Sequence, residues 1–200
     1  MPELPEVETV RGTLEGQIIG KTITNIEVYY AAMLENTTKE KFIHSLIGQT
    51  FQKIERYGKY LIFILDDYTI LSHLRMEGKY FLKDIHAPLE KHEHIVFILN
   101  QTISFRYHDT RKFGKMALLK TTKMQEIMKY SSLSHLGKEA NDTQFTKEEL
   151  YDRLKHKHVP IKTALLNQEI ICGLGNIYVD EVCFMSKLNP KMSSCHITME

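Results

Sequence analysis

The first residues of the chain could supply a nucleophile and an acid. Proline follows Met1, and removal of the initiator methionine would leave Pro2 with a free secondary amine. An α-amino group titrates near ~8, so part of it is uncharged at neutral pH and can attack an aldehyde-like carbon to form an iminium ion. Glu3 and Glu6 are close in the sequence and could transfer protons. The competing interpretation is that these residues only start a helix, whose positive end favours carboxylates.

Two further segments combine an apolar side chain with an arginine. Met76 lies in HLRMEG (residues 73–78), and Arg111 and Phe113 lie in DTRKFG (residues 109–114). An enzyme that rotates a base out of a duplex must fill the gap that the base leaves, and apolar wedges or the plane of an arginine can do so. The segments therefore favour contact with an opened DNA duplex, although a buried Met and Phe beside a solvated Arg would give the same sequence.

Basic residues gather in two places, although the formal net charge of the chain is only +1. Residues 153–162 (RLKHKHVPIK) hold four Lys or Arg and two His with no acid, and residues 106–120 hold five Lys or Arg against one Asp. Clusters of this kind suit a phosphate backbone. A solvated face of an ordinary protein is the competing interpretation.

The segment GLGNIYVDE (residues 173–181) indicates a glycine turn that opens a helix at Asn176. Backbone amides at a helix N-terminus, together with an Asn side chain, form a seat for a phosphate group. No βαβ strand precedes the glycines, which disfavours a dinucleotide-binding fold. A plain turn stays open as the alternative.

The composition is that of an ordinary globular protein, with 42% hydrophobic and 26% charged residues among 200. This length allows one or two domains with a buried core. The three cysteines are widely spaced and form no CxxC pair, which argues against a disulfide framework or a zinc knuckle in this stretch. No apolar run approaches the ~20 residues of a membrane span, and a reducing cytoplasm is the expected compartment.

A helix and a β-rich region must position the first of these segments. Val7, Val10 and Leu14 recur at helical spacing behind Pro5, which predicts an opening helix. From there to about residue 120 the chain shows short runs typical of strands. Examples are residues 22–30, 60–65, 68–74, 94–99 and 102–107. Many short strands at this spacing predict a sandwich or a barrel.

After residue 120 the pattern becomes helical. Thr146 followed by Glu149 forms a capping-box pattern that predicts a helix start. Pro160 suits the first turn of a second helix, and Asn176 begins a third. The polar stretch 137–144 is the expected linker between the β-rich and the helical parts.

Five segments occur in the order of one protein family. They are Met1–Thr9 (MPELPEVET), His73–Gly78 (HLRMEG), Lys91–His94 (KHEH), Asp109–Gly114 (DTRKFG) and Gly173–Glu181 (GLGNIYVDE). On these segments the chain resembles the formamidopyrimidine-DNA glycosylases, bacterial enzymes that excise oxidised purines such as 8-oxoguanine. The likeness runs from Pro2 to about Pro190.

The resemblance implies an α+β fold with two domains. An N-terminal helix and a β-sandwich would form a catalytic domain at residues 1–136. A helical helix-two-turn-helix domain for DNA binding would follow at residues 137–200. This second part would be incomplete, because the zinc finger in which family members end is absent from these 200 residues.

The resemblance also implies catalytic roles. Pro2 would be the nucleophile on C1′ of the damaged nucleotide. Glu3 would be the acid or base that helps to open the sugar ring, with Glu6 in support. Lys59 matches a lysine that contacts phosphate and takes part in the elimination chemistry.

Nine positions match DNA contacts of the family: His73, Met76, His92, Arg111, Phe113, Lys157, His158, Lys162 and Asn176. Among them, Met76, Arg111 and Phe113 match the trio that fills the opened duplex and faces the orphaned cytosine. His158, with Lys157 beside it, stands at the position of a DNA-binding lysine of the family.

The expected function is base-excision repair by a bifunctional DNA glycosylase and abasic-site lyase. It would remove 8-oxoguanine and formamidopyrimidines through a Pro2 iminium ion, followed by β,δ-elimination. The expected partner is damaged double-stranded DNA, bound by a monomer in the bacterial cytoplasm, with no membrane involved. No cofactor or metal site is expected in this chain, and one structural zinc is expected in the missing finger.

Two alternatives stay open. Without the finger, the 200-residue chain would bind duplex DNA without cleaving it. A glycosylase like endonuclease VIII would instead prefer oxidised pyrimidines, although that enzyme typically has Gly where this chain has Leu4.

Overall fold

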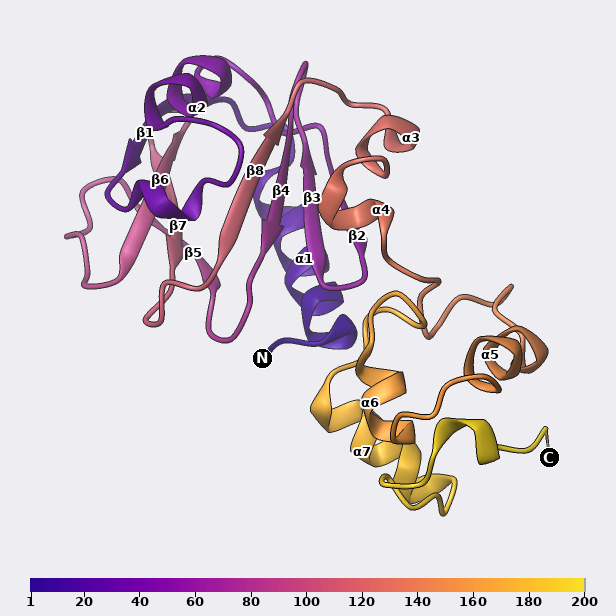
Figure 1. The fold of residues 1–200 in the computed structure, drawn as a ribbon. Coiled ribbons are helices and arrows are strands. Elements are labelled where there is room, and N and C mark those ends of the chain that lie inside the picture. The colour runs from indigo at the N-terminus through magenta and orange to yellow at the C-terminus, as the bar shows by residue number, and fades with distance from the viewer. Residues whose placement is uncertain (200) are drawn as a thin grey trace. The chain divides into compact units, whose positions relative to one another are not determined.

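The computed structural model describes residues 1–199, and the chain forms two compact units. The first unit comprises residues 1–56 and 60–128, and the second comprises residues 57–59 and the chain from Lys129 onward. Each unit has a hydrophobic core of its own. Figure 1 labels the helices and strands of both units.

The first unit opens with helix α1 (Leu4–Ile18), as the apolar spacing predicts. Glu3 is its N-cap and Pro5 stands in its first turn, where the missing amide hydrogen of proline costs nothing. The helix buries Val7, Leu14 and Ile18 in the core. Since one face of α1 is fixed in this way, its N-terminal residues are held at a defined edge of the unit.

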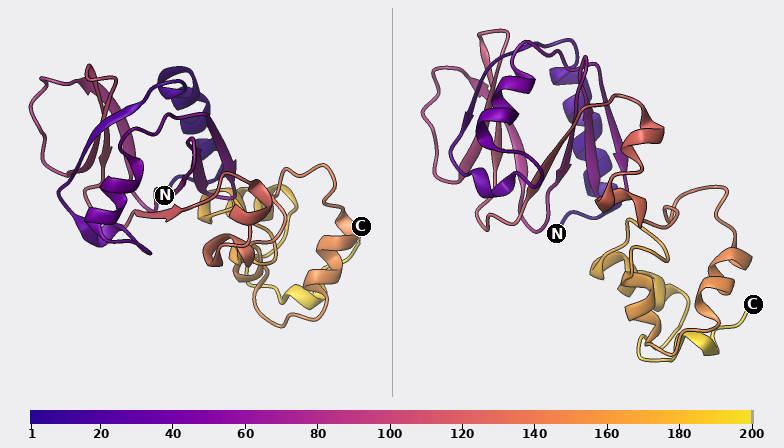
Figure 2. Two further views of the ribbon diagram at one scale, coloured as in Figure 1. Left: turned by 90° about the horizontal axis from the view of Figure 1, so that it is seen from above. Right: turned by 45° about the horizontal axis from the view of Figure 1, so that its top comes forward.

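Two four-stranded sheets form the body of the first unit, which confirms the predicted α+β fold with a sandwich. One sheet has the order β1 (Ile23–Val28), β6 (Glu93–Leu99), β7 (Ile103–His108), β5 (Lys79–Asp84). The other has the order β2 (Lys53–Tyr57), β3 (Tyr60–Ile64), β4 (Thr69–His73), β8 (Lys115–Leu119). The sheets pack face to face, as the two views of Figure 2 show, and the core between them draws residues from both.

Alternation along the strands decides which side chains enter this core. In β7, Phe105 and Tyr107 point inward and are fully buried, whereas Arg106 between them lies on the opposite face of the sheet. Phe63 of β3 meets Phe105 edge-on at 6.0 Å between ring centroids. Such aromatic contacts across the two sheets fix how the sheets pack.

Helix α2 (Lys39–Leu46) interrupts the stretch for which the sequence predicts strands alone. The hydroxyl of Thr38 accepts a hydrogen bond from the Lys41 amide at 3.2 Å and so caps the helix. Phe42 and Leu46, four residues apart, are buried on the side toward β1. The prediction is wrong here because the segment carries only two core residues, which is too few to give a clear helical period.

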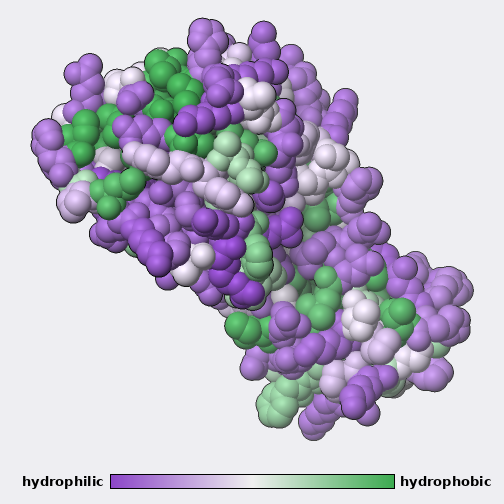
Figure 3. Space-filling model, turned by 60° about the vertical axis from the view of Figure 1, so that its left-hand side comes forward, coloured by the Kyte–Doolittle hydropathy of each residue, from purple (hydrophilic) through white to green (hydrophobic). Residues whose placement is uncertain are grey.

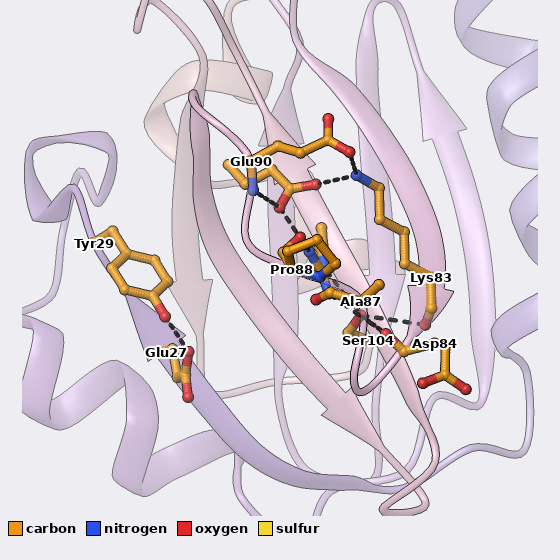
Figure 4. A network of polar contacts seen from close by, with 10 residues as sticks. Glu27, Tyr29, Lys83, Asp84, Ala87, Pro88, Glu90 and Ser104 are labelled. Atoms are coloured by element: carbon orange, nitrogen blue, oxygen red, sulfur yellow. Dashed lines mark hydrogen bonds and ion pairs between the residues drawn. The ribbon is translucent and has the colours of Figure 1, made fainter.

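Arg106 ties residues 84–90 to the outer face of its sheet. Figure 4 shows Ala87, Pro88 and Glu90 of this loop near Lys83. Its guanidinium donates to the carbonyl oxygens of Ala87 at 2.7 Å and Pro88 at 2.9 Å, and to Glu93 at 2.8 Å. Lys83 pairs with the other oxygen of Glu93 at 2.8 Å. The buried charge is therefore matched, which is the condition for a charge to be tolerated inside a protein.

Helix α1 is joined to β2 by charge as well as by packing. Glu8 accepts hydrogen bonds from Arg11 at 2.7 Å and from Arg56 of β2 at 2.8 Å. Burial alone would raise the pKa of Glu8, but the hydrogen bonds from Arg56 and Arg11 outweigh it and lower this pKa. The carboxylate stays charged near neutral pH and keeps the helix in place.

The second unit is helical. Its helices are α4 (Ser131–Ser134), α5 (Lys147–Leu154), α6 (Ile161–Leu166) and α7 (Asn176–Met185), with short 3₁₀ turns such as residues 194–196. Helix α3 (Met124–Ile127) ends the first unit. The capping prediction is confirmed, because the Thr146 hydroxyl accepts a hydrogen bond from Glu149 at 3.2 Å. The predicted starts of α6 after Pro160 and of α7 at Asn176 are confirmed as well.

The predicted linker, residues 137–144, is bonded into the second unit. The Gly137 amide donates to Gln168 at 2.8 Å, and the Cys172 amide donates to Lys138 at 2.9 Å. A side chain on Gly137 would meet the Glu169 carbonyl at 2.5 Å, so this close approach requires glycine. The start of the stretch is therefore a packed part of the fold.

Apolar side chains also lie at the surface of the second unit, as Figure 3 shows in its lower part. The most exposed of them are on α7, where Ile177, Phe184 and Met185 have 63%, 81% and 78% of their area accessible. The opposite side of the helix, with Val179 and Cys183, packs into the core of the unit.

Candidate active site

The N-terminus of α1 holds the first group of predicted catalytic residues. The Glu3 amide donates to a carboxylate oxygen of Glu6 at 2.9 Å, and the Glu3 side chain accepts from the Glu6 amide, which completes a capping box. Glu3 is almost fully buried, whereas Glu6 is exposed. The capping box therefore orients the Glu3 carboxylate immediately after Pro2.

A cavity of about 760 Å³ opens beside these residues, within the first unit. Pro2, Glu6 and Met76 all line it, together with Glu77. One wall is the face of α1 that runs from Thr9 to Gln17, and the other is the turn between β4 and β5 with the start of β5. The structure thus brings the predicted nucleophile and one predicted void-filling residue to a single pocket.

The turn between β4 and β5 is shaped by His73, the last residue of β4. Its Nδ1 accepts a hydrogen bond from the Arg75 amide at 3.0 Å, and its ring meets Tyr60 edge-on at 4.6 Å. Arg75 takes a positive φ of 53°, which starts the turn. Met76 follows at the tip with 41% of its area exposed, so its side chain is available to a partner.

The loop between β7 and β8 presents the other two members of the predicted trio. Asp109 is fully buried and accepts hydrogen bonds from the Arg111 amide at 3.0 Å and the Gly114 amide at 2.7 Å. The Arg111 guanidinium lies 4.9 Å from the centre of the Phe113 ring. A cation over an aromatic face is attractive, so the two exposed side chains hold each other in place.

His92 lies among basic residues before β6 and adopts a positive φ of 73°. Its ring is 5.9 Å from His108 and 6.2 Å from His94 between centroids. Desolvation, followed by the positive charges of Lys91, His108, His94 and Lys112, lowers the pKa of His92. An anion placed here would favour its protonated form.

The second unit carries the remaining predicted DNA-binding residues. Asn176 is exposed at the first turn of α7. Lys162 pairs with Asp180 at 2.6 Å, and the His158 Nδ1 lies 3.5 Å from the Cys195 sulfur. Lys157 is exposed just after α5. Their contacts with DNA stay predictions.

Lys59 occupies the turn between β2 and β3 and is buried. The preceding Gly58 has a φ of +56°, and its amide donates to Glu139 at 2.8 Å. The backbone of this turn is therefore fixed within the second unit, while the catalytic role of Lys59 stays a prediction.

Two residues of the site received no role from the sequence. Asp109 is the first residue of DTRKFG. Its spacing of two residues to Arg111 and five to Gly114 is the signal of a side chain that accepts hydrogen bonds from the backbone of its own loop. Glu77 lines the cavity next to Met76, but nothing in a single sequence places it there.

The part of the chain that the structure describes, residues 1–199, contains no cluster of three or more His, Cys, Asp or Glu placed to hold a metal ion. Within the same residues, no helix is both long and apolar enough to span a bilayer.

Comparison with known proteins gives consistent matches along the whole chain. The profile of the formamidopyrimidine-DNA glycosylase N-terminal domain matches residues 1–116, and that of the H2TH domain of the same enzyme matches residues 136–200. A formamidopyrimidine-DNA glycosylase from Lactobacillus gasseri is 47% identical over 195 residues, which is 97% of this chain and 69% of the relative.

Solved structures agree with these matches. The formamidopyrimidine-DNA glycosylase of Lactococcus lactis, bound non-covalently to DNA containing an AP site, superposes with a TM-score of 0.91 at 39% identity, covering 98% of this chain and 73% of that one. The same enzyme in complex with DNA containing Fapy-dG gives 0.91 at 40% identity, covering 98% and 72%. The chain belongs to the formamidopyrimidine-DNA glycosylase family.

Proposed function

We propose that this protein is a base-excision repair glycosylase that removes oxidised purines from damaged DNA and then cleaves the strand at the abasic site. Its relatives carry the name formamidopyrimidine-DNA glycosylase, and the similar solved structures include complexes with damaged DNA. The observation that carries the proposal is the cavity that Pro2, Glu6 and Met76 line together, with Glu3 oriented beside it by the capping box.

The chemistry requires that Met1 is removed, because the Pro2 nitrogen is otherwise part of a peptide bond. The free amine attacks C1′ of the damaged nucleotide, and the base leaves with its bonding electron pair. Glu3 donates a proton to the opening sugar ring, and the iminium ion that results acidifies the protons on C2′. Loss of a C2′ proton expels the 3′ phosphate, and a second elimination expels the 5′ phosphate, with Lys59 assisting.

Void filling and phosphate binding complete the proposal. Met76 and the stacked pair of Arg111 and Phe113 enter the gap that the extruded base leaves, which offsets part of the unstacking cost of a few kcal/mol. Basic and amide side chains contact the phosphate groups of the DNA. These side chains are His73, His92, Lys157, His158, Lys162 and Asn176.

The partner is double-stranded DNA, and we infer that the protein acts as a monomer in the bacterial cytoplasm. The structural zinc of the family requires a set of Cys or His ligands. The described residues do not bring such a set together, since Cys172 and Cys183 are buried separately and neither belongs to a metal-binding cluster.

Borohydride trapping tests the proposal, because it reduces an iminium ion to a stable covalent bond between protein and DNA. Processed protein should be trapped on duplex DNA containing 8-oxoguanine, and its mass should lack Met1. A variant that keeps an uncleaved residue before Pro2 is the matched control and should bind DNA without being trapped.

Three results would contradict or correct the proposal. Equal trapping of the blocked variant would show that another amine is the nucleophile. Salt-dependent DNA binding by processed protein, with neither trapping nor cleavage, would favour a DNA-binding module without catalysis. Faster cleavage at thymine glycol than at 8-oxoguanine would correct the lesion class to oxidised pyrimidines.

A further inference from the structure

Tyr107 sits between the two loops that carry the void-filling side chains. It is completely buried on β7, an inner strand of its sheet, paired with Tyr80 of β5 and Ile95 of β6. The Tyr107 ring lies 5.1 Å from the Tyr80 ring between centroids. A side chain mounted in this way is held rigidly, because its backbone is bonded on both sides and its ring is packed.

The hydroxyl of Tyr107 touches one glycine from each loop. A Cβ atom added to Gly114 would lie 1.6 Å from this oxygen, and one added to Gly78 would lie 2.3 Å from it. Real Cβ atoms essentially never come this close to another heavy atom. The backbones of both loops therefore rest directly against the same oxygen atom, which only glycine permits.

The two glycines adjoin the side chains that are predicted to enter DNA. Gly78 follows Met76 by two residues, and Gly114 directly follows Phe113. The Tyr107 hydroxyl also interacts with the Asp109 side chain, which accepts a hydrogen bond from the Gly114 amide at 2.7 Å, so packing and this carboxylate together hold the hydroxyl in place. Burial, together with nearby Tyr80 and Asp109, raises the pKa of Tyr107, so the hydroxyl stays uncharged.

We propose that Tyr107 is a positioning residue that sets the separation between the two loops, and so the spacing of Met76 from Arg111 and Phe113. This inference rests on the proposed function, in which the three side chains enter one gap in the duplex. A spacer that is too short would let the loops approach each other, and the trio would no longer match the space of one extruded nucleotide.

The test uses Tyr107→Phe, which removes only the oxygen that contacts the two glycines. The probe is duplex DNA with a stable abasic-site analogue and 2-aminopurine opposite it, because the fluorescence of 2-aminopurine increases when its stacking is disturbed. The unmodified chain should raise the fluorescence on binding, and Tyr107→Phe should raise it less. Excision of 8-oxoguanine should fall at least about tenfold, since a misplacement of ~1 Å can cost on the order of 100-fold in rate.

A second substitution gives a readout that a purely structural role would not change. Gly114→Ala should impair excision more than Tyr107→Phe, because the new methyl group meets the hydroxyl. In the double variant the contact with the oxygen at 1.6 Å is gone, but the new methyl group still meets the ring carbon Cζ of residue 107 at 2.7 Å. The double variant should therefore excise faster than Gly114→Ala alone and slower than Tyr107→Phe. Gly12→Ala, at a helical glycine with nothing within 4 Å of the added carbon, is the matched control and should excise normally.

Strand cleavage of a single-stranded abasic oligonucleotide separates this inference from the proposed function. That reaction needs Pro2 but no gap filling, so Tyr107→Phe should cleave it at the rate of the unmodified chain. Unchanged fluorescence and excision in Tyr107→Phe, or equal losses on both substrates, would overturn the positioning role. Failure of the unmodified chain to cleave the single strand would instead count against the proposed function, while the fluorescence would still report on the trio.

Discussion

At the residue scale, Glu3 combines a structural and a chemical task. Its carboxylate caps α1 by accepting the Glu6 amide, and its predicted role is to donate a proton to the sugar ring. A glutamine has a carbonyl oxygen that can accept the same hydrogen bond, but its amide cannot serve as an acid. The two tasks can therefore be separated by one substitution.

Glu3→Gln should lower the rate of base excision by about 10²- to 10⁴-fold, which is the usual contribution of a positioned acid or base. The midpoint of thermal unfolding should stay nearly unchanged, because the cap is kept. Single-turnover excision of 8-oxoguanine and a thermal melt would measure the two effects. Loss of activity in proportion to a loss of folded protein would show that Glu3 acts only through the helix.

His92 should make DNA binding depend on pH. Its pKa lies below the ordinary value of 6.5 in the free protein, so it is mostly neutral at neutral pH, whereas a phosphate group favours the protonated form. Binding then takes up a proton, and affinity for duplex DNA should rise as pH falls from about 7.5 to about 6, by at most about tenfold per pH unit. The lowered pKa of His92 has the opposite effect on the free energy of unfolding. Its contribution to stability is fully present above the pKa of the unfolded state and is lost as pH falls through the lower pKa of the folded state.

Fluorescence anisotropy across this pH range would measure the affinity, and His92→Gln should flatten the pH dependence. His44→Gln is the control, since His44 lies at the end of α2 and has no predicted contact with DNA. A slope that persists in His92→Gln would assign the proton uptake to another group.

At the element scale, sequence predicts an element well where several independent signals agree. For α1 these are the apolar spacing and Pro5 in the first turn, and for α5 they are Thr146 and Glu149. For α2 a single cap at Thr38 and two buried side chains are too little, so the helix is found only in the structure. Strand boundaries in the β-rich part shift by one or two residues, because hydrogen bonds between distant strands set them.

Two glycines, Gly12 inside α1 and Gly20 just after its end, provide a test of these local rules. Gly12→Ala lies inside the helix with open space around it and should raise the free energy of unfolding by about 1 kcal/mol. Gly20 also has open space around it but adopts a φ of +76°, so Gly20→Ala should lower the free energy of unfolding by roughly 1–2 kcal/mol. Chemical denaturation would measure the free energy of unfolding of both variants. A change in the same direction in both would contradict the explanation.

At the scale of the whole molecule, the separate cores predict that the two units unfold in separate steps. Phe97→Ala in the first core should lower the stability of one transition by about 3–5 kcal/mol, and Leu165→Ala in the second core should lower the other by about 2–5 kcal/mol. Differential scanning calorimetry would resolve the transitions. A single transition that both substitutions shift together would show that the units unfold as one.

The candidate site could be predicted from sequence only in part. Pro2, Met76, Arg111 and Phe113 lie in contiguous segments whose residue types indicate a chemistry, so the sequence alone suggests them as candidates. Sequence does not identify Tyr107, because its importance comes from one side-chain atom that meets the backbone of two separate loops, at Gly78 and at Gly114. Contacts that depend on tertiary packing leave no pattern in a single chain.

The hydrogen bonds between Arg106 and residues 84–90 determine which of these positions can be substituted without loss of the fold. Three of these hydrogen bonds go to main-chain carbonyl oxygens, those of Asp84, Ala87 and Pro88, which every amino acid possesses. In saturation mutagenesis, most substitutions at these loop positions should therefore leave the protein folded. At position 106 nearly every substitution, lysine included, should destabilise it, because only the planar guanidinium donates to several acceptors at once. One invariant side chain would thus leave its neighbours free to diverge.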